Sequence, residues 1–268
     1  MSSEWRDGSL LQVADRPERP GVGWGAFTLV GCEAGGPLLW PWHRERLAAT
    51  LARLGAPENV RLPDGVALRK LLKAEGLEGP ARVRVVGRAG SDSVWSVVAT
   101  AVACPEFGPG MKPARLALER WPGKPPMAAH KMLNREKWDI ARERARNSGA
   151  DDALLVDVGG HILETSAANI LVRRGSVVLT PPAPERCGPG IMRRWLVEQS
   201  GELDIPVREC DLKVDDVAVA DEVLMSNSVC GFRRVSRVVD RRWTDWPLFE
   251  RLAEAGVPAP GWASHRTR

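Results

Sequence analysis

Hydrophobic and polar positions in the first half of the chain predict helices and strands in mixed order. In residues 37–55, Leu47, Leu51 and Leu54 recur at the spacing of one face of a helix. Gly55 follows as a typical C-terminal stop. This pattern predicts an amphipathic helix whose leucines are buried.

The rest of the first half favours strands. Residues 81–90 and 93–102 alternate apolar and polar positions, which predicts a hairpin of two strands. A glycine-rich segment enters another predicted strand in residues 21–32, and residues 66–75 predict a second short helix. Residues 1–20 are polar and predict a loosely ordered start.

Prolines and glycines in residues 104–114 interrupt the pattern, as in a linker between domains. We therefore expect a small N-terminal domain over residues 1–108 and a larger C-terminal domain over residues 109–268. In both domains strands and helices are mixed, so the fold class is α+β.

The second half predicts a helix over residues 134–147, with Trp138 and Ile140 pointing inward. A strand over residues 153–158, a tight turn at Gly159-Gly160 and a return strand over residues 161–164 follow. Before this helix, the pattern predicts a strand at 114–121. After the return strand it predicts a hairpin around Gly175-Ser176 and a loop entering a helix at 185–201. A helix from about residue 214, a strand at 222–226 and a closing helix at 246–256 complete the prediction.

Composition excludes several classes of protein. The chain has 268 residues and a net charge of +4, and its basic residues form no cluster interleaved with aromatic ones, so no nucleic-acid partner is expected. No apolar run reaches the ~20 residues that span a bilayer, and the N-terminus has no signal-peptide core. Five dispersed cysteines form no C-x-x-C pair, which argues against a zinc site or a disulfide framework. We expect a soluble, cytoplasmic protein with reduced thiols and no metal.

Two charged residues are candidates for catalysis. Lys131 follows the small and apolar residues 127–129, and burial favours the neutral amine that can attack a carbonyl group. Glu164 ends the predicted return strand, and a carboxylate opposite a pyridinium nitrogen keeps that ring protonated as an electron sink. Taken singly, each residue is more often a solvated surface charge, so spacing alone decides nothing.

The surrounding motifs resemble a known family. The runs KMLNR, GADDALLVD and ETSAANIL are similar to those of fold-type IV pyridoxal-phosphate enzymes, which include branched-chain and D-amino-acid aminotransferases and 4-amino-4-deoxychorismate lyase. The resemblance implies a small N-terminal α/β sandwich domain and a larger C-terminal pseudo-barrel domain. It also implies that Lys131 carries pyridoxal 5'-phosphate covalently, that Glu164 faces the pyridine nitrogen, and that Asn169 completes the second motif.

Further residues are expected to hold the cofactor phosphate. The glycine-rich turn before Ile191 leaves backbone N–H groups free at a helix start, which is a phosphate site on physical grounds. The resemblance assigns this role to the amides of Ile191 and Met192. It adds Arg46, from the H-x-x-R-L run that starts at His43, and Asn227 with Ser228 from SNSVCGFRRV.

Four residues are candidates for binding the substrate. Thr28 matches the family segment G-x-G-x-F-[ET], although Trp24 stands where the family has aspartate. Arg84 and Arg88 lie on a predicted strand and are candidates to meet a substrate carboxylate, although a solvent-facing position is slightly favoured for both. Arg234 replaces a proline of the family and adds a positive charge.

The resemblance implies a small-molecule enzyme that works as a homodimer. The S-N-S run and the absence of tyrosine favour the lyase, which converts 4-amino-4-deoxychorismate to 4-aminobenzoate and pyruvate for folate synthesis. The alternative is a pyridoxal-phosphate-dependent aminotransferase for D-amino or branched-chain amino acids. A third interpretation keeps the fold without catalysis, as a cofactor-binding or interaction protein.

Overall fold

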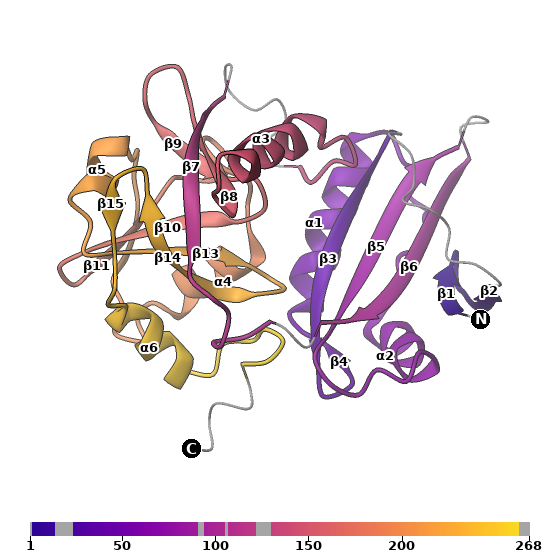
Figure 1. The fold of residues 1–268 in the computed structure, drawn as a ribbon. Coiled ribbons are helices and arrows are strands. Elements are labelled where there is room, and N and C mark those ends of the chain that lie inside the picture. The colour runs from indigo at the N-terminus through magenta and orange to yellow at the C-terminus, as the bar shows by residue number, and fades with distance from the viewer. Residues whose placement is uncertain (1, 14–23, 91–93, 105–106, 122–129, 263–268) are drawn as a thin grey trace. The chain divides into compact units, whose positions relative to one another are not determined.

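The computed structural model describes residues 2–13, 24–90, 94–104, 107–121 and 130–262, which belong to two compact units (Figure 1). The first unit consists of three segments, Met1–Phe107, His130–Asn134 and Pro258–Ala263, and the remainder forms the second unit. The small segment around Lys131 is therefore packed with the N-terminal residues. The domain boundary expected at residue 108 stays a prediction.

An antiparallel sheet is the centre of the first unit. Among the described residues it has six strands, in the spatial order β2 (Ser9–Val13), β1 (Ser2–Arg6), β6 (Trp95–Ala103), β5 (Ala81–Ala89), β3 (Gly25–Glu33) and β4 (Gly36–Pro37). The predicted hairpin is confirmed, because β5 and β6 pair along their whole length.

The expectation of a loosely ordered start is wrong for residues 2–13, which form the β1–β2 hairpin. Asp7 and Gly8 form its turn with φ angles of 47° and 108°. An Asp-Gly pair is a strong hairpin signal, since both turn positions need a positive φ. Trp5 is buried and anchors the hairpin beside β6.

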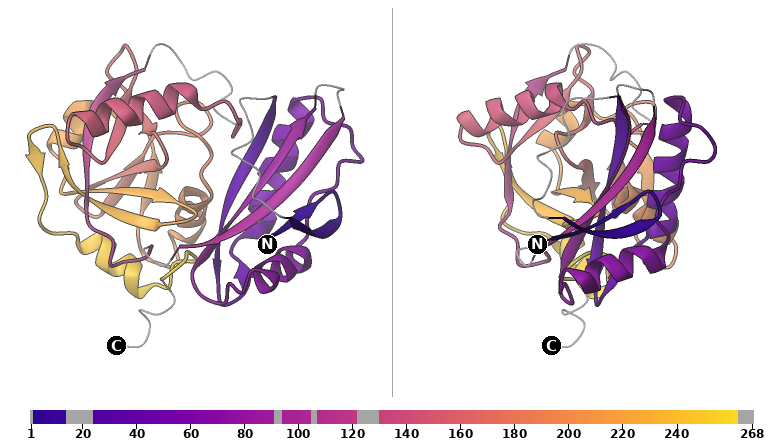
Figure 2. Two further views of the ribbon diagram at one scale, coloured as in Figure 1. Left: turned by 45° about the vertical axis from the view of Figure 1, so that its right-hand side comes forward. Right: turned by 90° about the vertical axis from the view of Figure 1, so that its right-hand side faces the viewer.

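Two helices cover this sheet, and both were predicted. Helix α1 (Trp40–Arg53) lies along one face of β3 and β5 (Figures 1 and 2). Leu47, Leu51 and Leu54 are buried, as expected. The helix comes so close that a Cβ on Gly87 of β5 would lie 2.8 Å from the Leu51 methyl carbons. Helix α2 (Gly65–Ala74) packs near β4 and β1.

The second unit is built on a larger, mixed sheet. Its strands follow the order β12 (Val207–Glu209), β11 (Val177–Thr180), β10 (Asn169–Arg174), β13 (Glu222–Asn227), β14 (Gly231–Val238), β7 (Ala114–Arg120), β8 (Asp152–Val156) and β9 (Ile162–Thr165), and β15 (Arg241–Arg242) pairs with β14. The pairs β11–β12, β14–β7 and β7–β8 are parallel. Fully buried side chains such as Leu154, Ile170 and Phe232 show where the core lies.

The turn between β8 and β9 is longer than the two residues predicted. Val156 pairs with Ile162, so residues 157–161 form the loop. The Asp157 carboxylate closes it by accepting the backbone N–H groups of Gly159 and His161 at 2.8 and 2.9 Å. The return strand therefore begins at Ile162 rather than at residue 161.

Four helices accompany this sheet within the described ranges: α3 (Glu136–Asn147), α4 (Ile191–Gln199), α5 (Val214–Ala218) and α6 (Pro247–Glu254). The inward role expected of Ile140 is wrong, because its side chain is 41% exposed. The buried face of α3 is formed by Ala141 and Ala145, with Trp138 packed against Trp121 at a ring distance of 4.7 Å. None of the helices in the described ranges combines the length and apolarity that crossing a membrane requires.

Candidate active site

Lys131 lies in a short segment that is bridged to β3 of the first sheet. Phe27 donates its backbone N–H to the Lys131 carbonyl at 3.0 Å, and Leu133 donates to the Gly25 carbonyl at 2.9 Å. An antiparallel bridge between Ala26 and Met132 fixes the register. A fixed main chain leaves only side-chain torsions to place the amine. The apolar residues 127–129, which suggested burial of this lysine, lie outside the described residues.

Two cations flank the ring of Phe27 in this unit. The Lys131 Nζ atom and the Arg84 Cζ atom each lie 5.1 Å from the ring centroid. Lys131 and Arg84 are therefore at most about 10 Å apart. Arg88 is exposed and lies four residues along β5, on the same face of the strand as Arg84. The structure thus brings one of the two predicted strand arginines close to the lysine.

Thr28 and Arg46 meet on the other face of the sheet, where α1 packs. The Arg46 Nη2 atom donates to Thr28 Oγ1 at 3.1 Å, and His43 Nδ1 lies 2.7 Å from the same hydroxyl. Thr28 and His43 are fully buried. Burial, followed by the charges of Arg46 and Lys131, holds the pKa of His43 well below its ordinary value, so the imidazole is neutral. His43 belongs to the H-x-x-R-L run, yet no function was predicted for His43 itself.

In the second unit, two donors hold the carboxylate of Glu164. The indole N–H of Trp138 reaches Oε1 at 3.2 Å, and the backbone N–H of Gly188 reaches Oε2 at 3.1 Å. With each oxygen held, the carboxylate has a fixed plane. Trp138 was predicted only as a core residue, since a contact across 26 positions leaves no local signal in the sequence.

A glycine-rich turn enters α4 beside Glu164. Asn169 donates its side-chain amide to the Gly188 carbonyl at 2.9 Å, and a Cβ on Gly190 would lie 1.8 Å from Asn169 Oδ1. Only glycine fits at position 190 without a shift. The turn ends at the first helical residues, Ile191 and Met192, whose side chains are buried.

This turn fits a phosphate group. The first backbone N–H groups of α4 have no partner inside the helix, and the positive end of the helix dipole lies there. Gly190, directly before these groups, is packed against Asn169 too closely for any Cβ. A dianion matches both properties.

Asn227 shapes the turn that carries Ser228. Its Oδ1 atom accepts the backbone N–H groups of Val229 and Cys230 at 3.0 and 2.9 Å, and its amide donates to the Ala167 carbonyl at 3.3 Å. These bonds account for a structural role of Asn227. A direct role in cofactor binding stays a prediction for both residues.

Arg234 is engaged in the packing of the second unit. Its Nη2 atom donates to the carbonyls of Pro109 and Met111 at 3.3 and 3.0 Å. Its guanidinium lies 5.4 Å from the ring of Trp246 and 4.9 Å from that of Phe249. These contacts hold the segment before β7, and a role in substrate binding stays a prediction.

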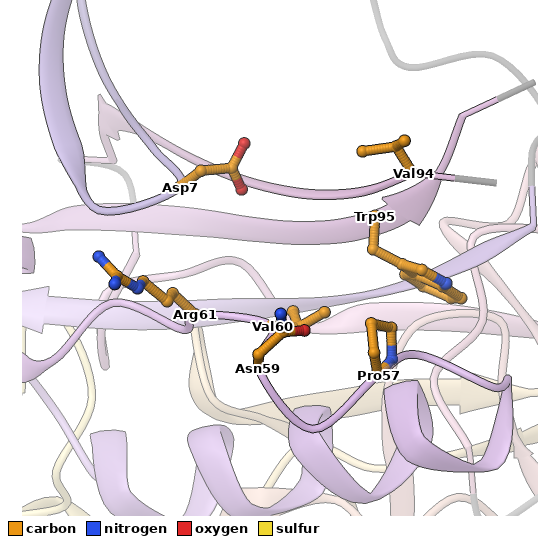
Figure 3. Close-up of a pocket in the computed structure, with 7 residues that line it drawn as sticks. All are labelled: Asp7, Pro57, Asn59, Val60, Arg61, Val94 and Trp95. Atoms are coloured by element: carbon orange, nitrogen blue, oxygen red, sulfur yellow. The ribbon is translucent and has the colours of Figure 1, made fainter. Parts of the chain in front are cut away.

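A surface hollow of about 380 Å³ lies in the first unit (Figure 3). Most of its lining side chains are exposed, and none belongs to the predicted site: Asp7, Pro57, Asn59, Val60, Arg61, Val94 and Trp95. The candidate residues of the first unit, Lys131 and Arg46, are thus not part of this hollow, and Glu164 and the α4 turn are the candidates of the second unit.

Comparison with known proteins gives consistent matches. The family model described as amino-transferase class IV matches residues 25–238. An aminodeoxychorismate lyase of Vibrio harveyi is 29% identical over 229 residues, which are 80% of this chain and 83% of that protein. A branched-chain-amino-acid aminotransferase of Escherichia coli is 32% identical over 99 residues, which are 37% of this chain and 32% of that protein.

The solved structures agree on the architecture. A branched-chain aminotransferase of Thermoproteus uzoniensis, crystallised with norvaline, superposes with a TM-score of 0.82 at 20% identity. The match covers 95% of this chain and 93% of the other.

Proposed function

Because the chain belongs to the class IV aminotransferase family of pyridoxal-phosphate-dependent enzymes, we propose that it binds this cofactor and acts as an aminodeoxychorismate lyase. The reaction would release 4-aminobenzoate and pyruvate from 4-amino-4-deoxychorismate. The fold is that of the fold-type IV enzymes, as the motifs predicted.

The proposal assigns residues described above to each part of the cofactor. Arg46, Ser228 and the amides of Ile191 and Met192 would hold the phosphate, because a guanidinium, a hydroxyl and a helix start all donate to anions. Glu164 would face the pyridine nitrogen with the orientation that Trp138 and Gly188 give it. Pyridoxal phosphate, when bound, supplies an electron sink for the bonds around the substrate's amine-bearing carbon.

Lys131 would move protons during the reaction. As a neutral amine it can take a proton from a carbon, and as an ammonium it can return one. Arg84, close to the same Phe27 ring, is the best placed of the predicted arginines to receive a substrate carboxylate. Both groups then act on one side of the sheet, where the main chain is held by strand hydrogen bonds.

One observation favours the lyase over an aminotransferase. The similarity to the Vibrio harveyi lyase extends over 80% of this chain, whereas that to the Escherichia coli aminotransferase extends over 37%. The S-N-S run and the absence of tyrosine point the same way. Transamination of D-amino or branched-chain amino acids is the second candidate, since the same residues can serve it.

The activity assay separates the two. Purified protein is supplied with enzymatically generated aminodeoxychorismate, and 4-aminobenzoate and pyruvate are measured, beside a panel of D- and L-amino acids with 2-oxo acids. Release of both products with a silent panel supports the lyase. Amino transfer without product release would replace it by the aminotransferase.

Lys131→Ala tests the proposed role of the lysine. We expect loss of turnover by several orders of magnitude and no cofactor retained after borohydride reduction, as read by mass spectrometry. Lys137→Ala is the matched control, because Lys137 is an exposed lysine of α3 that has no proposed role. Turnover at the level of the unmodified enzyme in Lys131→Ala would refute the assignment.

The proposal includes a homodimer, following the resemblance. Sedimentation equilibrium should give about twice the mass of one 29.3 kDa chain. A single-chain mass in a preparation with full activity would contradict it.

A further inference from the structure

Two threonine–histidine pairs connect α1 to the strands beneath it. Thr28 of β3 meets His43 of α1 at 2.7 Å, and His130, next to Lys131, meets Thr50 of α1 at 3.2 Å. The antiparallel register places His130 beside Thr28. In the first pair the threonine lies on β3 and the histidine on α1. In the second pair the histidine lies beside β3 and the threonine on α1.

The first pair acts on Arg46. Arg46 donates into the Thr28 hydroxyl, so the hydroxyl hydrogen of Thr28 is available to a second acceptor. His43 is neutral and buried, and a neutral imidazole accepts through one nitrogen. Arg46 then donates to Thr28, and Thr28 donates to His43. This chain of hydrogen bonds holds the guanidinium in one position.

The second pair acts on Lys131. The Thr50 hydroxyl donates to the Arg46 carbonyl at 2.9 Å, which leaves its lone pairs to accept from His130 Nδ1. Partial burial and the charge of Arg53 lower the pKa of His130, so its ring is also neutral near pH 7. His130 precedes Lys131 directly, and the contact therefore ties the lysine's main chain to the helix turn that carries Arg46.

We infer that Thr28, His43, Thr50 and His130 are positioning residues, which set the separation between the Arg46 guanidinium and the Lys131 amine. The inference rests on the proposed function, because that separation matters for a ligand with a phosphate at one end and an aldehyde at the other. Such a ligand is rigid across its ring. If the Arg46 guanidinium or the Lys131 amine is displaced, the reacting atoms are therefore no longer correctly oriented.

Two ligands distinguish the two pairs. Pyridoxal 5'-phosphate uses both Arg46 and Lys131, whereas pyridoxal lacks the phosphate and uses only the lysine end. Their binding to the apo-protein is measured by quenching of tryptophan fluorescence, and their attachment to Lys131 by mass spectrometry after borohydride reduction.

Thr28→Val should raise the Kd for pyridoxal phosphate about tenfold, as expected for a lost hydrogen bond to a charged group. The Kd for pyridoxal should not change. Thr50→Val should weaken both ligands, because the lysine end serves both. Thr28→Ser and Thr50→Ser keep the hydroxyl and should stay within about twofold of the unmodified chain. Thr244→Val, at an exposed position of the second unit, is the control.

A double-mutant cycle tests the second pair. If His130 acts through Thr50, Thr50→Val and His130→Phe together should weaken pyridoxal no more than either change alone. Additive losses of affinity in this cycle would overturn the inference. So would a Thr28→Val variant that binds both ligands equally less tightly, or one that binds both as tightly as the unmodified chain. Circular dichroism shows which variants are folded, and the serine variants keep the test valid if a valine variant is not. Failure of the unmodified chain to bind pyridoxal phosphate would overturn the proposed function as well.

Discussion

Glu164 shows how single residues acquire a role from distant parts of the chain. Its oxygens are held by the Trp138 side chain and the Gly188 main chain, which lie on opposite sides of it in the sequence. A carboxylate that accepts a bond at each oxygen keeps one orientation. The same loop residue, Gly188, is held by Asn169, so the glutamate and the α4 turn form one hydrogen-bonded group.

Gly190 is the most demanding position in this group. Gly190→Ala would place a Cβ 1.8 Å from Asn169 Oδ1, so the turn or the asparagine must move. We expect a loss of about 1–3 kcal/mol in the free energy of unfolding and weaker cofactor binding. Urea denaturation measures the first effect.

The control for this prediction is Gly201→Ala, after the end of α4. A Cβ there meets nothing within 4 Å. Equal stability of the two alanine variants would show that the turn at Gly190 adapts without cost.

The sequence identified only part of the candidate site. Lys131 and Glu164 stood out because local runs of residues surround them. Thr50 and Trp138 had no such signal, because their hydrogen bonds join positions that are distant in the sequence. His43 lies in the H-x-x-R-L run, but only the fold shows its contact with Thr28.

Periodicity identified elements well where one face is consistently apolar. The leucine stripe of α1 and the alternation in β5 were sufficient, since burial of these faces dominates local preferences. The β1–β2 hairpin was missed because β2 has exposed leucines and its turn signal, Asp7-Gly8, is only two residues long. In α3 the buried face consists of alanines, and the larger Ile140 misled the assignment of its orientation.

Helix α2 depends on its N-cap. The Asp64 carboxylate accepts the backbone N–H of Ala67 at 2.7 Å. Asp64→Ala should lower the free energy of unfolding by about 1 kcal/mol, while Asp64→Asn should preserve most of it, because asparagine caps equally well. Chemical denaturation of the three proteins measures these free energies. An asparagine variant as unstable as the alanine variant would exclude capping as the cause.

Helix α6 is capped from a strand. Fully buried Glu222 of β13 accepts the backbone N–H groups of Leu248 and Phe249 at 2.8 and 2.9 Å and an N–H of Arg173 at 3.0 Å. Burial nevertheless raises the pKa of Glu222 above its ordinary value. The folded protein therefore holds this proton more tightly than the unfolded chain does.

This shift predicts a pH dependence with a definite sign. The contribution of the raised pKa to stability is fully present below the unfolded value of about 4.3 and is lost as the pH rises through the folded pKa. The stability of the unmodified chain relative to Glu222→Gln should therefore decline over this window and then level off. Urea denaturation of both proteins from pH 4 to pH 8 tests this, and a relative stability that increases with pH would contradict it.

For the whole molecule, a bound cofactor is expected to stabilise the fold by mass action. A ligand that binds only the folded chain, present at 100 times its Kd, adds about 2.7 kcal/mol to the free energy of unfolding. Thermal denaturation with increasing pyridoxal phosphate should show a rising midpoint in the unmodified chain. A smaller rise is expected for Lys131→Ala at the same concentrations, and equal rises would mean that the lysine contributes nothing to affinity.

The bridged segment at residues 130–134 also has a consequence for recombining this protein with its relatives. It pairs with β3 through Phe27 and Leu133, although more than 100 positions separate it from β3 along the chain. A chimaera that joins residues 1–107 to the remainder of a relative would import a foreign partner for β3. A chimaera that stays functional should therefore take Gly25–Glu33 and His130–Asn134 from the same parent protein.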